Sequence, residues 1–154
     1  MYRILVFSDS HGHTDYITSA IERIPADLIV HLGDKVYDIE KVSYIYDDLS
    51  FEYVSGNCDF DSYLPSTKII EAEGFRILLT HGHPYNVKQS LLSLKSYAIE
   101  NNVDCILYGH THISECSYEN GMLILNPGSG SVPGDESFGV IEIEGGKIKG
   151  CIIT

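Results

Sequence analysis

Hydrophobic positions in the first part of the chain alternate between short continuous runs and stretches of helical spacing. The continuous runs predict strands at Tyr2–Phe7, Asp27–His31 and Phe51–Val54. Apolar side chains three and four residues apart predict two helices between these strands, one from Thr14 or Asp15 to about Ile24 and one over Asp38–Leu49. Strands that alternate with helices in this way favour a parallel sheet with right-handed crossovers.

Hairpin signals dominate the rest of the chain. Turn residues separate paired apolar runs at three places, and the predicted strand pairs are Lys68–Ala72 with Arg76–Thr80, Ile113–Tyr118 with Met122–Leu125, and Phe138–Glu144 with Lys147–Ile153. A helix over Val87–Glu100 and a buried strand over Val103–Leu107 lie between the first two hairpins. This order predicts an α/β protein with two packed mixed sheets and helices outside. The 154 residues fit one domain, residues 1–154.

Most of the predicted buried strands are followed by glycine and by a side chain that can bind a metal ion. Successive groups lie 23 to 29 residues apart, about one strand and its return connection, so they should gather at one edge of a sheet. His110 and His112 stand two positions apart, and on extended backbone such residues point to the same side. The candidate ligands are Asp9, His11, Asp34, Asn57, His81, His110 and His112.

Seven groups of this kind are too many for one tetrahedral ion. They suit two ions about 3.5–4 Å apart that share a bridging carboxylate. Imidazole and oxygen donors without thiolate favour Mn, Fe, Co, Ni or Zn over Ca or Mg, with Mg left open. Each motif alone also has a structural explanation as a helix cap or a turn, so only the complete set indicates a metal centre.

Composition and charge exclude several classes of function. The net charge of −12 argues against nucleic acid as a partner, because binding to a phosphate backbone needs clustered Lys and Arg. No apolar stretch approaches the roughly 20 residues that span a bilayer, and Met1–Phe7 lacks the basic region of a signal peptide. We therefore expect no membrane partner and a cytoplasmic location, and leave a homo-oligomer open. The four cysteines form no CxxC pair and are expected to be free thiols.

In their order along the chain, these residues resemble the pattern of the calcineurin-like metallophosphoesterases: DxH, GD, GN, a lone His and then GHxH. The short length and the segments Gly56-Asn-Cys-Asp59 and Asn126-Pro-Gly-Ser129 make the chain most similar to the small YfcE-type phosphodiesterases. This resemblance implies a four-layer α/β/β/α sandwich that binds two divalent ions, usually Mn²⁺. It also implies hydrolysis of small phosphate esters, with a hydroxide that bridges the two ions as the nucleophile.

The resemblance further implies which residues hold each ion. One ion would be bound by Asp9, His11, Asp34 and His112. The other would be bound by Asp34, Asn57, His81 and His110, so that Asp34 bridges the two ions. The expected catalytic residues are Asp34, Asn57 and His81. The expected substrate contacts are Asn57, Cys58 and His83.

Two positions depart from the family pattern. Cys58 stands where many larger relatives have a histidine that acts as an acid or contacts the phosphate, and Gly134 stands where small relatives often have an arginine. We therefore expect weak assistance to the leaving group, because a thiol is a weak and poorly directed proton donor. His83 is left open between the substrate pocket and a plain loop role, while His31 is expected in the core or behind the ligands and Asn126 in a turn.

A rival interpretation is a binding module without catalytic activity. One eukaryotic branch of the same small subfamily serves as a scaffold subunit of the retromer sorting complex, with an impaired metal site. All seven ligand types are present in this chain, His81 included, so the sequence favours the enzyme.

Overall fold

The strands form two sheets of five strands each over residues 1–60 and 63–154, the part of the chain that the computed structural model describes. The first sheet has the order β10-β9-β1-β2-β3, with β1 and β2 parallel, β2 and β3 parallel, and β9 antiparallel to both of its neighbours. Its strands are β1 (Tyr2–Phe7), β2 (Leu28–His31), β3 (Ser50–Tyr53), β9 (Phe138–Glu144) and β10 (Lys147–Ile153).

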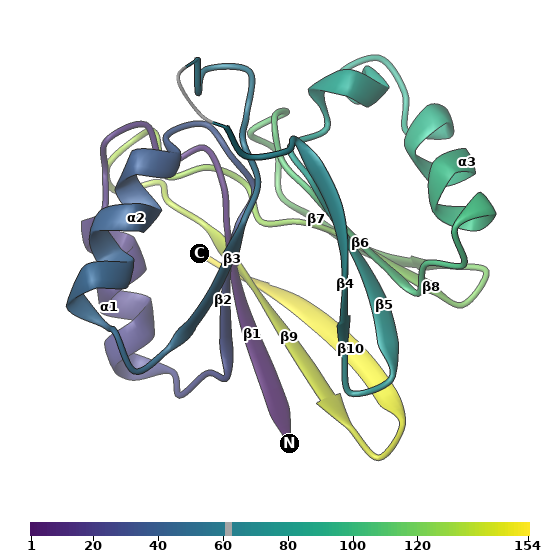
Figure 1. Cartoon of the computed structure of the whole chain (residues 1–154), viewed down its shortest axis with the longest axis horizontal. Helices are drawn as coiled ribbons and strands as arrows, with labels where there is room; N and C mark the ends of the chain where they lie inside the picture. Colours follow the sequence, from purple (N-terminus) through teal and green to yellow (C-terminus); the bar gives the residue numbers. More distant parts are fainter. Residues whose placement is uncertain (61–62) are drawn as a thin grey trace.

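The second sheet has the order β4-β5-β6-β8-β7, with β5, β6 and β8 parallel. Its strands are β4 (Thr67–Ala72), β5 (Phe75–Thr80), β6 (Cys105–Tyr108), β7 (Glu115–Glu119) and β8 (Met122–Asn126). The helices α1 (Asp15–Arg23) and α2 (Val36–Ile45) cover the outer face of the first sheet, and α3 (Leu92–Glu100) covers the outer face of the second (Figure 1). The predicted four-layer sandwich is confirmed.

Alternation along each central strand explains why these strands read as continuous apolar runs. In β1, Ile4 and Val6 face the core between the sheets, whereas Leu5 and Phe7 pack against the helices. In β5, Leu78 packs on the α3 side while its neighbours face the inter-sheet core. Strands covered on both faces need apolar side chains at every position, which removes the two-residue period of a half-exposed strand.

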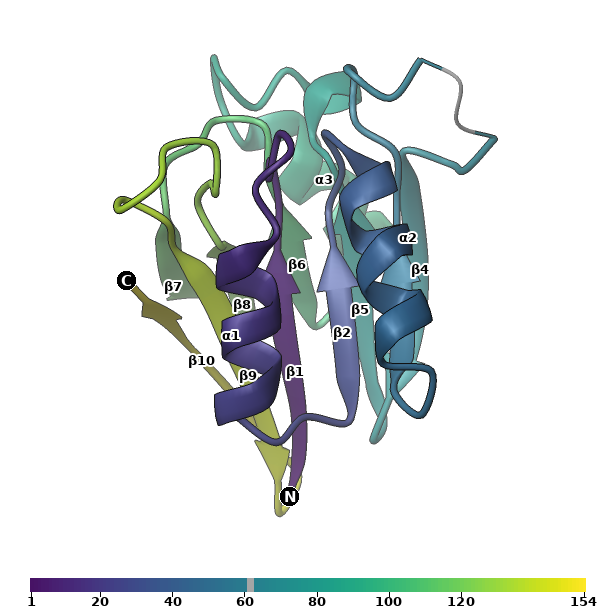
Figure 2. The same cartoon turned by 90° about the vertical axis from the view of Figure 1, so that its left-hand side faces the viewer.

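Parallel pairing brings the carboxyl ends of the central strands to one edge of the molecule. Phe7 of β1 pairs with His31 of β2, and Thr80 of β5 pairs with Tyr108 of β6, so the loops that follow begin at matching heights. Figure 2 shows β1 and β2 pointing the same way, with the connecting loops gathered beyond their tips. The loops are joined by backbone hydrogen bonds, from Asp9 N–H to the Gly33 carbonyl and from Gly109 N–H to the His81 carbonyl.

Two predicted helices differ from those observed. The second begins at Val36 and ends at Ile45, because a carboxylate from a distant loop, Asp59, accepts the N–H groups of Lys35 and Val36 at its start. The third begins at Leu92 instead of Val87, because His83–Tyr85 forms a 3₁₀ turn and Asn86 is left-handed with φ 55°. Neither cause is visible in hydrophobic spacing. The three predicted hairpins are confirmed as the pairs β4–β5, β7–β8 and β9–β10.

The remaining bulk expectations have simple outcomes. All four cysteines are free thiols, with Cys105 buried in the core. Within the described residues, no helix has the length and hydrophobicity required to cross a bilayer.

His31 is a buried imidazole with a defined role behind the loops, as expected from the sequence. Its Nδ1 accepts the Gly33 N–H at 3.1 Å, and its Nε2 lies 2.9 Å from Ser10 Oγ, which itself donates to Asp38. Burial lowers the pKa of His31 to about 4. The neutral ring thus ties the β1 loop to the β2 loop.

We expect the metal-free protein to lose stability as the pH falls from about 6.5 towards 4, partly through His31. The unfolded chain takes up a proton at His31 near pH 6.5 while the folded chain does not, so folding is penalised between the two pKa values. At pH 5 this amounts to about 2 kcal/mol. Urea unfolding of the parent and of His31→Gln at pH 7 and pH 5, with a chelator present, should show a smaller pH dependence in the variant. Equal pH dependence would contradict this role.

Candidate metal centre

The loops that carry the predicted ligands turn sharply as soon as they leave the strands. Asp9, His11 and Asp34 have φ of 55°, 47° and 61°, and His110 and His112 have φ of 73° and 63°. The expectation that His110 and His112 converge from extended backbone is therefore wrong. They converge because left-handed residues alternate with other conformations and keep turning the chain towards the same point. Non-glycine residues in this region cost about 1–3 kcal/mol each and persist where surrounding contacts hold them.

Four of the predicted ligands form one compact group. One ligand atom from each of them lies within 4.8 Å of the others. His112 Nε2 is 3.2 Å from Asp9 Oδ1, and His11 Nε2 is 3.7 Å from Asp34 Oδ2. The four residues are Asp9, His11, Asp34 and His112, which the family resemblance assigned to one ion.

The other predicted ligands meet around His81. Its Nε2 lies 2.9 Å from Asn57 Oδ1, 3.1 Å from His110 Nδ1 and 3.5 Å from Asp34 Oδ2. The same Asp34 oxygen is 3.7 Å from His11 Nε2, so it stands between the two groups. The structure thus brings all seven sequence-predicted ligands together. Asp9 and His81 are fully buried at its base, whereas Asn57 and His112 are exposed at its mouth.

Unpaired polar atoms indicate that this cluster is built for a bound cation. Asp9 Oδ1 and His11 Nε2 are buried without a hydrogen-bond partner among the described residues. Such groups cost about 1–3 kcal/mol each when nothing satisfies them. Asp9 Oδ1 faces imidazole nitrogens at 3.2 to 4.0 Å, from His112, His81 and His11. Carboxylate oxygen and imidazole nitrogen at these positions fit a divalent transition-metal ion.

Each buried ligand is held by one atom and leaves another facing the centre. Asp9 Oδ2 accepts hydrogen bonds from Ser8 Oγ and from the His110 N–H at 3.0 Å. Asp34 Oδ1 accepts the Cys58 N–H at 2.9 Å. His81 Nδ1 lies 2.8 Å from the Leu32 carbonyl, which only accepts, so its Nε2 lone pair is directed inward. Outer contacts of this kind fix the orientation of metal ligands.

The protonation states also suit metal binding. Burial lowers the pKa of His81 to about 4, so the ring is neutral at pH 7. Burial raises the pKa of Asp9 to about 7 against the opposing effect of its hydrogen bonds. Burial acts to raise the pKa of Asp34 as well, but the nearby His81 and the Cys58 N–H hold it below its ordinary value. The neutral His81 ring and the ionised Asp34 carboxylate are in the forms that bind metals, whereas Asp9 reaches its binding form by releasing a proton.

Asp59 is an important residue that the sequence did not assign to the site. Its carboxylate accepts four backbone N–H groups, those of Asp34 at 2.8 Å, Lys35 and Val36 at 2.9 Å, and Gly56 at 2.7 Å. It therefore fixes the backbone of the shared ligand and the first turn of α2 from another loop. The only sequence signal was its place at the end of the segment Ser55–Asp59.

Close backbone approach explains the glycine before Asn57. A Cβ on Gly56 would lie 2.2 Å from Asp34 Oδ1 and 2.4 Å from the Asp34 backbone nitrogen. Any larger residue would displace the shared carboxylate. Gly56 therefore lets the Asn57 loop and the Asp34 loop touch.

The remaining sequence candidates border the ligand cluster. The Cys58 thiol is exposed, and burial together with the Asp34 charge raises its pKa. The His83 ring centroid is 5.3 Å from that of His81, and its Nδ1 is buried without a partner in the described residues. Asn126 makes a turn by accepting the Gly128 N–H, and it donates to the Gly109 carbonyl below the His110 loop.

The profile of the calcineurin-like phosphoesterase superfamily domain matches residues 2–146. The chain belongs to this superfamily. Probable metallophosphoesterase YsnB of Bacillus subtilis (strain 168) is 33% identical to this phosphoesterase-family chain over 146 residues, which cover 92% of the chain and 84% of YsnB. Phosphodiesterase YfcE of Escherichia coli (strain K12) is 26% identical over an alignment of 169 positions, which includes 92% of the chain and 88% of YfcE.

Solved structures confirm the phosphoesterase fold. A conserved protein of Streptococcus pneumoniae, described as a predicted phosphoesterase, superposes with a TM-score of 0.81 at 29% identity and covers 99% of this chain and 89% of its own. Wild-type Vps29 of Entamoeba histolytica, complexed with Zn²⁺, has a TM-score of 0.68 at 24% identity, with 98% of each chain covered. The likeness to Vps29 shows a shared fold alone.

Removal of the Asp59 carboxylate should weaken metal binding and the fold together. We expect Asp59→Ala to bind Mn²⁺ about 10- to 100-fold more weakly, because the backbone of Asp34 loses its anchor. Asp27→Ala is a matched control, since Asp27 also accepts a backbone N–H, that of Arg3. Calorimetric titration of both variants with Mn²⁺ measures the effect. Parent-like affinity in Asp59→Ala would contradict the positioning role.

Proposed function

We propose that this phosphoesterase-superfamily chain is a metal-dependent phosphodiesterase that hydrolyses small phosphate esters at a centre holding two divalent ions, with Mn²⁺ the expected metal. The observation that carries the proposal is the position of Asp34 Oδ2, 3.7 Å from His11 Nε2 and 3.5 Å from His81 Nε2. A carboxylate between two sets of nitrogen and oxygen donors suits a shared ligand. Phosphodiesterase names among the relatives support the reaction class.

The chain's own residues have separate tasks in this proposal. Asp9, His11, Asp34 and His112 would hold one ion, and Asp34, Asn57, His81 and His110 the other. Two divalent ions in such a site supply an activated water as nucleophile at neutral pH and neutralise the phosphoryl oxygens. Asp34 keeps its inward oxygen in place through the Cys58 N–H, and His81 keeps its inward nitrogen through the Leu32 carbonyl.

The scaffold alternative receives support from the Vps29 fold likeness alone. The complete ligand set favours a hydrolase, because buried ligand atoms without hydrogen-bond partners, such as Asp9 Oδ1, are costly to retain without a function. The net charge of −12 favours a small substrate, because a strongly acidic surface repels long polyanions.

The proposal predicts two Mn²⁺ ions per chain and no turnover without Asp34 or His110. Asp34→Ala should abolish hydrolysis of bis(p-nitrophenyl) phosphate, because its loss removes the ligand common to both ions. His110→Ala should do the same through one ion. Calorimetry and metal analysis give the stoichiometry, and circular dichroism checks the fold. Asp48→Ala, a change in the α2–β3 loop, is the control. Near-normal turnover in either ligand variant at saturating Mn²⁺ would overturn these roles.

The second prediction of the proposed function concerns proton donation to the leaving group. Cys58 is exposed with a raised pKa, so its thiol is protonated but donates weakly. The rate should therefore fall steeply as the leaving group becomes more basic. A positioned acid would contribute about 10²- to 10⁴-fold and flatten this dependence.

A series of aryl and alkyl diesters with graded leaving-group pKa measures this dependence in the parent, Cys58→Ala and Cys58→His. We expect Cys58→Ala to stay within a few-fold of the parent on aryl diesters, and Cys58→His to improve esters with basic leaving groups. A parent rate nearly independent of leaving-group pKa would mean that another group, such as His83, acts as the acid.

A further inference from the structure

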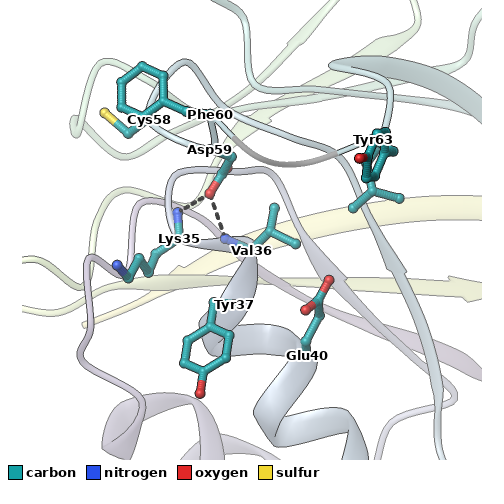
Figure 3. Close-up of a pocket in the computed structure, with 9 residues that line it drawn as sticks. Lys35, Val36, Tyr37, Glu40, Cys58, Asp59, Phe60 and Tyr63 are labelled. Atoms are coloured by element: carbon teal, nitrogen blue, oxygen red, sulfur yellow. Dashed lines mark hydrogen bonds between the residues drawn. The ribbon is translucent and has the colours of Figure 1, made fainter.

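A pocket of about 460 Å³ opens beside the candidate metal centre, between the start of α2 and the loop that follows Asn57. Figure 3 shows Cys58 and Phe60 on one side of it, Tyr63 on another, and Tyr37 and Glu40 on the α2 side. Its volume lies within the range of about 300–1,000 Å³ typical of small-molecule sites. The family resemblance implies a substrate contact for one lining residue, Cys58, and assigns no role to the others.

The pocket gathers aromatic side chains that the fold does not bury. Phe60 is 89% exposed and Tyr63 104% exposed, and Tyr37 is 61% exposed. Single exposed apolar residues are ordinary, but several around one concavity indicate a binding surface. The Tyr37 ring already lies below Lys41 Nζ, 5.1 Å from its centroid. The exposed rings of Phe60 and Tyr63 are therefore the aromatic surfaces on which a bound ring can stack.

The pocket is continuous with the ligand cluster through neighbouring residues. Lys35 directly follows the shared ligand Asp34, and Cys58 directly follows Asn57 and donates its N–H to Asp34. Asp59 binds the N–H groups of Lys35 and Val36 and so fixes the two walls to each other (Figure 3). An organic group on a phosphoryl group held at the centre can extend from Cys58 towards Phe60.

We propose that this pocket, lined by Phe60, Tyr63 and Lys35, binds an aromatic ring carried by the phosphate ester, either a simple aryl group or a nucleobase. The proposal rests on the proposed function, because the metal centre must hold the phosphoryl group. Stacking of a ring on an aromatic side chain strengthens binding, and it depends little on which ring is bound. Lys35, which lines the pocket and directly follows the ligand Asp34, adds a positive charge to it.

Binding of two phosphonates to the Mn²⁺-loaded protein measures the effect of the ring on affinity, independently of its effect as a leaving group on the rate. Phenylphosphonate and methylphosphonate carry the same charged group, and neither is hydrolysed. By calorimetry we expect the phenyl compound to bind about 10-fold more tightly. Phe60→Ala and Tyr63→Ala should each reduce this ratio to about 3-fold or less and leave methylphosphonate affinity unchanged. Tyr44→Ala, which removes an 82% exposed ring from α2 outside the pocket, should keep the parental ratio.

A second pair of ligands distinguishes the two sources of the ring. If the pocket binds a nucleobase, adenosine 5′-monophosphate should bind more tightly than ribose 5-phosphate, and Phe60→Ala should remove this difference. If the pocket binds a simple aryl group, only the phenyl compound should bind more tightly than its partner without the ring. Equal affinity for the two phosphonates in the parent would overturn the pocket and leave the proposed function standing. No binding of either phosphonate would contradict the proposed function itself. Equal weakening of both phosphonates in Phe60→Ala would mean a structural effect and also overturn the pocket.

Discussion

The candidate site depends on two buried ligands, Asp9 and His81, placed where the carboxyl ends of both sheets meet. A buried carboxylate is expensive unless donors satisfy it. Asp9 obtains one donor from its own loop, Ser8, and one from the His110 backbone, which belongs to the second sheet's loops. The hydrogen bond from the His110 N–H to Asp9 therefore both joins loops of the two sheets and orients the ligand. Sheet packing that moved by an ångström would leave this carboxylate without its second donor.

Strain is concentrated in the same loops. Five of the ligands have positive φ, and none of them is glycine. Such conformations are unfavourable in an isolated chain. They persist here because the backbone around them is fixed from outside. The Asp59 carboxylate holds the Asp34 N–H, and the peptide group before His110 is held at both ends, since its N–H donates to Asp9 and its Gly109 carbonyl accepts from Asn126. The fold supplies rigidity where the ligands need it.

Hydrophobic pattern and residue spacing were sufficient to predict the two sheets and the gathering of the seven candidate ligands at one edge of the fold. The strands are covered on both faces or paired in hairpins, and both arrangements leave clear local signals, as in β1 and in the β9–β10 pair. Asp59 could not be predicted, because its four partners lie on backbone amides of other segments, and any residue type can supply an amide. The start of α2 was misplaced for the same reason. The left-handed geometry of His110 and His112 depends on contacts across the sheets and has no sequence period.

The loop after β3 combines two parts with different constraints. Gly56 and Asp59 are bound to the Asp34 backbone by close contact and hydrogen bonds, so almost no substitution is tolerated there. Phe60, one residue further on, is 89% exposed, so the fold itself places little constraint on its side chain. On the proposed role of Phe60, mutations at the tip would alter which organic groups fit beside the centre and leave the geometry of the candidate ligands unchanged. A loop built in this way offers a short evolutionary route from one substrate to another, in which the reaction is preserved while its specificity changes.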